Sequence, residues 1–359
     1  MNVGIITFHR TINIGAVLQA SALNSYIEEK GIKCEIIDFI PNNEIPDLSI
    51  IHKVLHYLRC ILTLPTSIQR KKKKKKFLQY IDEYITLSNE VYYGDKDEKL
   101  KTTNYDVLVS GSDQILNTAL TGNSKAYYLD FFNGKKISYA SSFGRKNVSK
   151  EETELIRNEL PKFAALSVRE QSGADIIKRE IGREPQLVMD PVFLLSKDEW
   201  CKRCNEELKL PEKYIFVYSM EVSPVLENVV STIKKKTGLP IKIVRGGGKP
   251  GLIEGNEDST CGPEEFLRYI RDAELVITNS FHGTAFSLIF EKKFLCIAHS
   301  TRNARLENIL HLIEQDEKMI FNLLETYSDK VICGDKSISN LERLIDLSKD
   351  YLTQNIGKS

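Results

Sequence analysis

Residues 275–290 place a histidine where acid–base chemistry is possible. They are predicted to form a buried strand, a polar turn at Asn279 and Ser280, and then an apolar helix. We therefore expect His282 in the first turn of that helix, where free backbone N–H groups and the helix dipole favour an anion and disfavour a charged imidazole. A neutral histidine beside an anion can act as an acid or a base. The alternative is that this histidine only caps its own turn.

Polar residues also follow four predicted strands in the first half of the chain. They are Ser112, Asp113 and Gln114, then Ser142, then Arg169 and Glu170, and finally Asp190. In an open parallel sheet, ligands bind at the carboxyl ends of the strands. We therefore expect these side chains to share one edge of a sheet. For Arg169 the alternative is a surface ion pair with Glu170 or another neighbour.

Composition excludes several classes of protein. The chain has 359 residues, 42% of them hydrophobic, which is enough for two domains with cores of their own. A net charge of +1 argues against a general nucleic-acid binder. The seven scattered cysteines are typical of reduced thiols in the cytoplasm, and Cys201 and Cys204 form a C-x-x-C pair without partners at zinc spacing. We therefore expect no metal site. The first residues are predicted to form a strand and not a signal peptide.

The order of the predicted elements indicates two α/β domains. Residues 3–39 form a strand–helix–strand unit, but Gly15 stands alone and the glycine triplet of a dinucleotide site is absent, so NAD is not expected. A second series of units begins at Lys213. We place the boundary near residue 205, giving domains 1–205 and 206–359, and expect the last helix, 338–352, to pack back onto the first domain. A Gly246–Gly248 loop can cradle a phosphate, although a flexible loop is the favoured interpretation.

Residues 50–76 allow two interpretations. Residues 50–64 are apolar at helical spacing, and Arg70 and six consecutive lysines follow. Such a segment can lie on an anionic membrane surface. The favoured interpretation is a core helix followed by a solvated, lysine-rich helix, because a packing stripe continues at helical spacing through Phe77, Tyr80, Ile81, Tyr84 and Ile85.

Six segments, taken in order, resemble the polysaccharide pyruvyl transferase family. They are residues 13–20 (NIGAVLQA), 110–115 (SGSDQI), 137–144 (ISYASSFG), 166–170 (LSVRE), 189–191 (MDP) and 278–284 (TNSFHGT). The resemblance implies an α/β fold of two Rossmann-like domains facing each other across a cleft, similar to GT-B glycosyltransferases. It also implies transfer of pyruvate from phosphoenolpyruvate onto two hydroxyls of a sugar, as a cyclic ketal, in the synthesis of bacterial surface or capsular polysaccharide. Such a transferase requires no cofactor.

The resemblance assigns roles to individual residues. His282 matches the catalytic histidine of the family, and Arg169 matches an arginine needed for activity; we add Asp113 as a base or a sugar-binding group. The expected donor-binding residues are Asn279, Ser280, Gly283, Thr284, Arg302 and Arg305. The expected acceptor-binding residues are Asn13, Gly15, Gln19, Ser112, Gln114 and Ser142. The chain departs from the family at Ser280-Phe281, where some members have Arg-Leu, and at Leu116, where many have tryptophan.

The expected partners follow from this function. The first domain is expected to bind a saccharide acceptor, lipid-linked, at the inner face of a bacterial membrane, and the second to bind phosphoenolpyruvate. Nucleic acid is not expected as a partner, and the sequence does not specify an oligomeric state. One alternative is a GT-B-like glycosyltransferase that uses a sugar nucleotide. A further alternative is a saccharide-binding scaffold that has lost catalysis.

Overall fold

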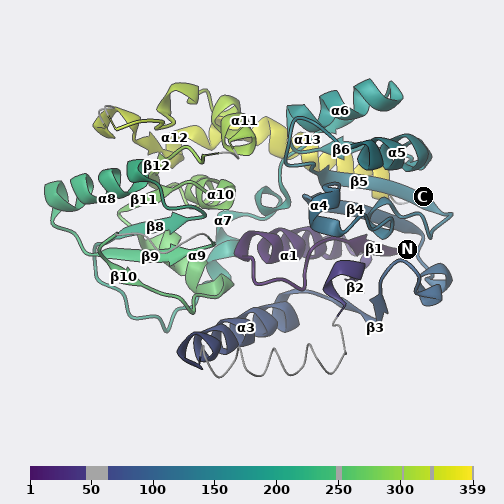
Figure 1. The fold of residues 1–359 in the computed structure, drawn as a ribbon, viewed down its shortest axis with the longest axis horizontal. Helices are drawn as coiled ribbons and strands as arrows, with labels where there is room; N and C mark the ends of the chain where they lie inside the picture. The colour runs from purple at the N-terminus through teal and green to yellow at the C-terminus, as the bar shows by residue number, and fades with distance from the viewer. Residues whose placement is uncertain (46–63, 248–252, 301–302, 324–326, 358–359) are drawn as a thin grey trace.

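A computed structural model gives the fold and describes residues 1–45, 64–247, 253–300, 303–323 and 327–357. Each half of the chain builds its own sheet with helices packed against it (Figure 1). The first sheet has the order β3-β2-β1-β4-β5-β6-β7, and all of its strand pairs are parallel. Its strands are β1 (Asn2–Ile6), β2 (Lys33–Ile40), β3 (Leu87–Tyr93), β4 (Val107–Asp113), β5 (Lys135–Ser141), β6 (Ser167–Val168) and β7 (Gln186–Leu187).

The second sheet has the order β10-β9-β8-β11-β12-β13, and only the edge strand β13 pairs antiparallel. Its strands are β8 (Ile215–Ser219), β9 (Ile241–Arg245), β10 (Asn256–Glu257), β11 (Leu275–Thr278), β12 (Lys293–Cys296) and β13 (Ile332–Cys333). The predicted boundary near residue 205 falls between β7 and β8.

The described helices connect these strands. They are α1 (Ile14–Glu29), α3 (Leu64–Tyr84), α4 (Thr118–Thr121), α5 (Lys150–Glu159), α6 (Gln171–Ile181), α7 (Lys197–Lys202), α8 (Pro224–Thr237), α9 (Pro263–Asp272), α10 (Phe281–Ile289), α11 (Ala304–Leu312), α12 (Gly334–Ser337) and α13 (Ser339–Ile356). Within the described ranges, none of them has the length and apolarity that crossing a membrane requires.

The strand order reverses once in each sheet, between β1 and β4 and between β8 and β11. At such a reversal the connections leave toward opposite faces, and a crevice opens beyond the carboxyl ends of the two strands. His282 follows β11 and Asp113 ends β4, so two of the three predicted catalytic residues lie at a reversal, whereas Arg169 follows β6. Strand β4 continues to Asp113, so Ser112 and Asp113 belong to the strand and do not follow it as predicted.

The last helix returns to the first sheet. Figure 1 shows α13 running from the side of the second sheet across to the first. The Tyr351 hydroxyl donates to the carbonyl of Ser138 in β5 at 2.9 Å, and the hydroxyl of Ser348 accepts from the backbone N–H of Met189 at 2.8 Å. The second sheet is therefore inserted, in sequence, between β7 and a helix that packs on the first.

Helix α3 has a buried end and a basic end. Phe77, Tyr80, Ile81 and Ile85 are buried and Tyr84 is half-buried, as the packing stripe predicted. Four lysines of the run are exposed, namely Lys71, Lys72, Lys74 and Lys75, whereas Lys76 forms an ion pair with Glu265 of α9 at 2.8 Å. The apolar segment predicted as a helix lies almost entirely outside the described residues.

Candidate active site

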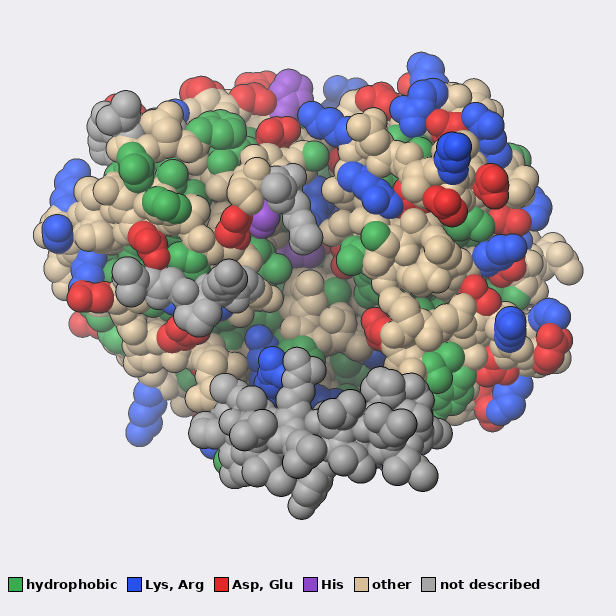
Figure 2. Space-filling model, in the orientation of Figure 1, with side chains coloured by type: hydrophobic (Ala, Val, Ile, Leu, Met, Phe, Trp, Pro, Cys, Tyr) green, Lys and Arg blue, Asp and Glu red, His purple; other side chains and the backbone are tan. Residues whose placement is uncertain are grey.

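A cavity of about 290 Å³ lies between the carboxyl edges of the two sheets. Figure 2 shows this face hollowed between the two halves, with histidine side chains at the hollow. The first half contributes Phe8, Thr11, Asn13, Ala16, Glu44, Asp113, Gln114 and Leu120. The second half contributes Tyr218, Met220, Asn279, Ser280, Phe281, His282, His299, Arg305 and Leu306.

His282 lies in the first turn of α10, as predicted, and only 9% of its side chain is exposed. Its ring reaches the first half of the molecule, because a Cβ built on Gly15 would stand 2.0 Å from Nδ1. The ring forms no hydrogen bond with any described residue, so it does not cap its own turn. Nε2 is buried 3.9 Å from Oδ2 of Asp190 and has no hydrogen-bond partner among the residues that the structure describes.

The surroundings of His282 keep it neutral. Burial lowers the pKa of its imidazole from 6.5 to about 4, and the guanidinium groups of Arg169 and Arg305 contribute to the lowering. The carboxylates of Asp190 and Asp113 oppose the shift. At neutral pH the ring is thus uncharged, as expected from its position at a helix N-terminus.

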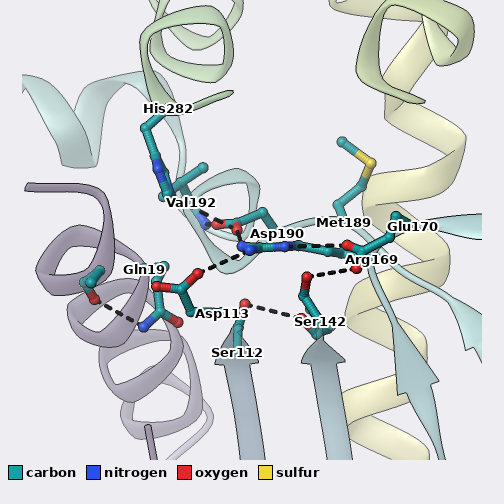
Figure 3. Close-up of polar contacts among 12 residues, drawn as sticks. Gln19, Ser112, Asp113, Ser142, Arg169, Glu170, Met189, Asp190, Val192 and His282 are labelled. Atoms are coloured by element: carbon teal, nitrogen blue, oxygen red, sulfur yellow. Dashed lines mark hydrogen bonds and ion pairs between the residues drawn. The ribbon is translucent and has the colours of Figure 1, made fainter. Parts of the chain in front are cut away.

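Arg169 lies at the centre of a buried ionic cluster (Figure 3). Its Nη1 donates to Asp190 at 2.6 Å, its Nη2 donates to Asp113 at 2.9 Å, and its Nε lies 3.5 Å from Glu170. Burial opposes its charge, but the three carboxylates outweigh burial and raise the pKa of the guanidinium. The side chain is 2% exposed and does not line the cavity.

This cluster changes the interpretation of Arg169. The sequence left two alternatives for Arg169, an arginine needed for activity and a surface ion pair with Glu170 or another neighbour. The structure instead buries it among three carboxylates, because the ends of β4, β6 and β7 converge there. Arg169 therefore orients Asp113 and Asp190 and acts on the cavity through them.

Asp113 faces the cavity from the end of β4. Burial alone would raise the pKa of its carboxyl, but Arg169, Arg305 and His282 together hold that pKa below its usual value. Asp113 is consequently an ionised acceptor, oriented by Arg169, at the boundary between the two halves.

Arg305 contributes a guanidinium group to the wall of the cavity. It lies in the first turn of α11, and within the described ranges no carboxylate pairs with it. Burial, and then the charge of Arg169, lower the pKa of Arg305. The ring of Phe281 lies 6.0 Å from its guanidinium carbon and 5.5 Å from that of Arg169. Phe281, which stands where some family members have leucine, thus contacts both cations. Arg302 lies outside the described residues.

Four other predicted site residues line the cavity: Asn13, Gln114, Asn279 and Ser280. Asn13 caps α1 by accepting from Ala16 N–H at 3.3 Å. Asn279 bridges two loops, accepting from Met220 N–H at 2.8 Å and donating to the carbonyl of Glu221 at 2.6 Å.

Six predicted site residues lie behind the cavity wall and do not line it. They are Gly15, Gln19, Ser112, Ser142, Gly283 and Thr284. Gln19 donates to Thr7, whose hydroxyl donates to the carbonyl of Ser112, so these residues join the ends of β1 and β4. Ser142 donates to Glu170 at 2.6 Å.

The glycines and Thr284 have packing roles. Gly15 makes room for His282, and a Cβ on Gly283 would stand 2.3 Å from Oγ1 of Thr278. Thr284 is fully buried beside Cys296. These positions build the wall and do not line the cavity, so their direct contact with a ligand stays a prediction.

Several cavity residues were not predicted. Phe8, Tyr218, Met220 and Leu306 supply apolar surface, and His299 lies 3.1 Å from Glu221. Phe8, Tyr218 and Met220 follow or end strands beside the reversals, which is the signal that could have identified them. Leu116, the departure from the family pattern, is buried in the core and does not line the cavity.

No group of histidines, cysteines and acidic residues within the described part of the chain is arranged to hold a metal ion. Cys201 and Cys204 carry free thiols, and the Cys204 Sγ donates to the carbonyl of Trp200 at 3.6 Å.

Replacing Gly15 with alanine tests the contact between the halves. We expect Gly15→Ala to displace the His282 ring and to lower the free energy of unfolding by about 1–3 kcal/mol through overpacking. Denaturant unfolding measures the loss. Gly173→Ala, also in the first turn of a helix, is the control, since its new Cβ would meet Val168 at an ordinary 3.4 Å. Equal stability of both variants would contradict the contact.

The pKa of His282 predicts a pH dependence of stability. Between pH 6.5 and about 4 the unfolded chain binds a proton at this residue that the folded chain does not. The free energy of unfolding therefore decreases as the pH is lowered from 6.5 to about 4, and this group contributes about 3 kcal/mol to the decrease. We expect His282→Gln to lack this component in urea unfolding at pH 4.5 and 7. Identical pH slopes for the two proteins would show that the ring is not buried neutral.

Comparisons with known proteins agree with this architecture. A family model described as polysaccharide pyruvyl transferase matches residues 13–301. A search of curated proteins found no significant match.

Among solved structures, a putative UDP-N-acetylglucosamine 2-epimerase from Listeria monocytogenes is similar, with a TM-score of 0.51 and 11% identity over 99% of this chain and 90% of the other. The UDP-GlcNAc 2-epimerase from Neisseria meningitidis, solved with UDP-GlcNAc, has a TM-score of 0.50 and 9% identity over 97% and 93%. At such identity the likeness concerns the fold alone, and that fold is GT-B-like with two Rossmann-like halves. Because the family model covers most of the length of the chain, the protein belongs to the polysaccharide pyruvyl transferase family and is a transferase.

Proposed function

We propose that the protein transfers pyruvate from phosphoenolpyruvate onto two hydroxyls of a sugar, as a cyclic ketal. The proposal rests on one observation: the guanidinium of Arg305 and the neutral imidazole of His282 both line the wall that the second half contributes to the cavity. A half-buried guanidinium without a carboxylate partner among the described residues favours an anionic ligand. The neutral imidazole beside it is suited to proton transfer.

The charges of the cavity wall differ between the halves. The second half contributes Arg305 and two histidines beside the N-terminus of α10, which suits a small molecule with a phosphate and a carboxylate. The first half contributes two carboxylates, Glu44 and Asp113. Carboxylates accept hydrogen bonds from sugar hydroxyls and repel anions. We therefore assign the donor to the second half and the saccharide to the first.

His282 is the proposed acid. In the unliganded site the two nearby arginines help to lower the pKa of its ring. The negative charge of the bound donor offsets these cations, so donor binding raises that pKa and favours a protonated ring. His282 then gives a proton to the methylene carbon of the donor, and the adjacent carbon becomes electrophilic.

A sugar hydroxyl next bonds to that carbon. Asp113 is placed to accept a hydrogen bond from the attacking hydroxyl, whose proton returns to His282. The bond between carbon and the phosphate oxygen breaks, a second hydroxyl closes the ring, and its proton leaves with inorganic phosphate. Phosphoenolpyruvate and a diol thus give a ketal and phosphate with atoms and charges balanced. The charge on phosphate is carried by Arg305 and the helix N-terminus, so the steps call for no resident cofactor.

The acceptor is proposed to be lipid-linked, as an intermediate of surface or capsular polysaccharide synthesis at the cytoplasmic face of a membrane. The exposed lysines of α3, Lys71, Lys72, Lys74 and Lys75, support this part of the proposal. Two large apolar side chains on the same helix, Ile68 and Leu78, are each 49% exposed. Basic side chains beside exposed apolar ones favour a surface of anionic lipid headgroups.

Replacing Arg305 tests the donor site. Wild-type protein incubated with phosphoenolpyruvate and a panel of hexose and N-acetylhexosamine acceptors should release phosphate and yield a product heavier by pyruvic acid minus water. We expect Arg305→Ala to raise the KM for phosphoenolpyruvate by about tenfold or more, because a charge-assisted bond is lost. Arg157→Ala, at an exposed ion pair of the first half, is the control. Stabilisation by UDP, without stabilisation by phosphoenolpyruvate, would instead indicate a sugar-nucleotide glycosyltransferase.

Charge reversal on α3 tests the membrane contact. We expect a variant with Lys71, Lys72, Lys74 and Lys75 replaced by glutamate to sediment less with vesicles that contain phosphatidylserine, because each lysine near the surface contributes about 1 kcal/mol. Turnover of a water-soluble acceptor should be unchanged. The matched control also replaces four lysines with glutamate: Lys234, Lys235 and Lys236 of α8, and Lys242 of β9. Equal sedimentation of all three proteins argues against this contact.

A further inference from the structure

Asp190 has a fixed position at the end of the first sheet. It follows β7, and its residue is 1% exposed. Its Oδ1 accepts from the backbone N–H of Val192 at 3.2 Å, and its Oδ2 accepts from Arg169 at 2.6 Å. The backbone of a short 3₁₀ turn, Pro191–Phe193, and a buried guanidinium therefore hold both oxygens in place.

The same Oδ2 faces the ring of His282 across the boundary between the halves (Figure 3). The distance to Nε2 is 3.9 Å, which is about 1 Å longer than a hydrogen bond. Nε2 is buried and has no hydrogen-bond partner in the described part of the chain. A buried polar nitrogen in that position is unfavourable until it gains an acceptor.

We propose that Asp190 is the positioning residue of His282: a small approach of the two halves lets Nε2 donate to Oδ2, and Nδ1 is then the nitrogen that exchanges protons with the substrate. This inference rests on the proposed function. Asp190 acts through the imidazole and does not contact substrate, since it lies behind the cavity wall.

The charged groups around the ring explain why this carboxylate matters. Asp113 acts on it from β4, Arg169 from the end of β6, Arg305 from α11 and Asp190 from the end of β7, while α1 places Gly15 against the ring. The arginines lower the pKa of His282 and the two aspartates raise it, Asp190 more than Asp113. Once a bound anion offsets Arg305, Asp190 is the group that stabilises the imidazolium.

Two isosteric variants separate positioning from general stability. Asp190→Asn removes the carboxylate that faces His282, and Glu170→Gln removes another carboxylate from the same Arg169 cluster. The pKa of His282 is measured by NMR of the ¹⁵N-labelled side chain, with and without phosphoenolpyruvate. We expect Asp190→Asn to lower this pKa by about one pH unit or more in the complex and Glu170→Gln to leave it unchanged. A pKa that is unchanged in Asp190→Asn overturns the proposal.

Kinetics give an independent result. We expect Asp190→Asn to lower kcat by about a hundredfold with little change in the KM for phosphoenolpyruvate, and to shift the acid limb of the pH profile. A purely structural role would affect kcat and KM equally in both variants and would overturn the proposal.

Asp190→Glu keeps the charge and is expected to retain the wild-type pKa of His282. Asp190→Glu also provides a test if Asp190→Asn folds poorly. A shift of the His282 pKa in Asp190→Glu as large as the one expected for Asp190→Asn contradicts the proposal. If wild-type protein transfers no pyruvate, the proposed function fails, whereas the NMR titration of the unliganded proteins still decides the role of Asp190.

Discussion

The burial of one guanidinium, that of Arg169, is the constraint on which the site depends. A charge that is 2% exposed is tolerated only when its partners supply both charge and hydrogen bonds. Asp113 and Asp190 supply both, and Glu170 adds its charge at 3.5 Å; the three carboxylates stand at the ends of β4, β7 and β6. Removing any of these carboxylates leaves a charge partly uncompensated. The ionic cluster therefore fixes how β4, β6 and β7 end, and with them the edge that faces the second half.

The cluster also separates two kinds of arginine. Arg169 is paired with three carboxylates, whereas Arg305 lines the cavity with no carboxylate partner among the described residues. The ring of Phe281 lies near both guanidinium groups and so connects the buried Arg169 to Arg305 in the cavity wall. The repulsion between the two guanidinium groups contributes to the lowered pKa of Arg305. An incoming anion relieves that repulsion, which makes the unliganded site ready for a negatively charged ligand.

Much of the fold was predictable because buried parallel strands are continuous apolar runs followed by turns. The strand before His282, the helix after it and most strand ends were predicted within a few residues. Strand β3, Leu87–Tyr93, was missed since it is a polar edge strand whose pairing with β2 is not apparent from its residues.

The site was predictable only in part. Sequence places a residue at a strand end, but it does not say whether the side chain faces the cavity, as Asp113 does, or the interior, as Ser112, Ser142 and Arg169 do. Successive side chains in a strand point to opposite faces, so an error of one residue in the predicted register reverses the direction of every side chain. The roles of Gly15 and Asp190 depend on contacts between elements far apart in the chain, and no local pattern carries that information.

The path of the chain between the halves sets how the molecule can move. It crosses from the first sheet to the second after β7, and it crosses back before α13, which packs on β5 (Figure 1). Because the chain joins the halves twice, we expect their relative motion to be a rotation that opens or closes the cavity between them and leaves both links intact. Such a rotation changes the aperture of the cavity and the gap between Asp190 and His282 at the same time. We therefore expect the admission of a large saccharide and the alignment of the His282 ring to be coupled, because opening the cavity also widens the 3.9 Å gap between the ring and Asp190.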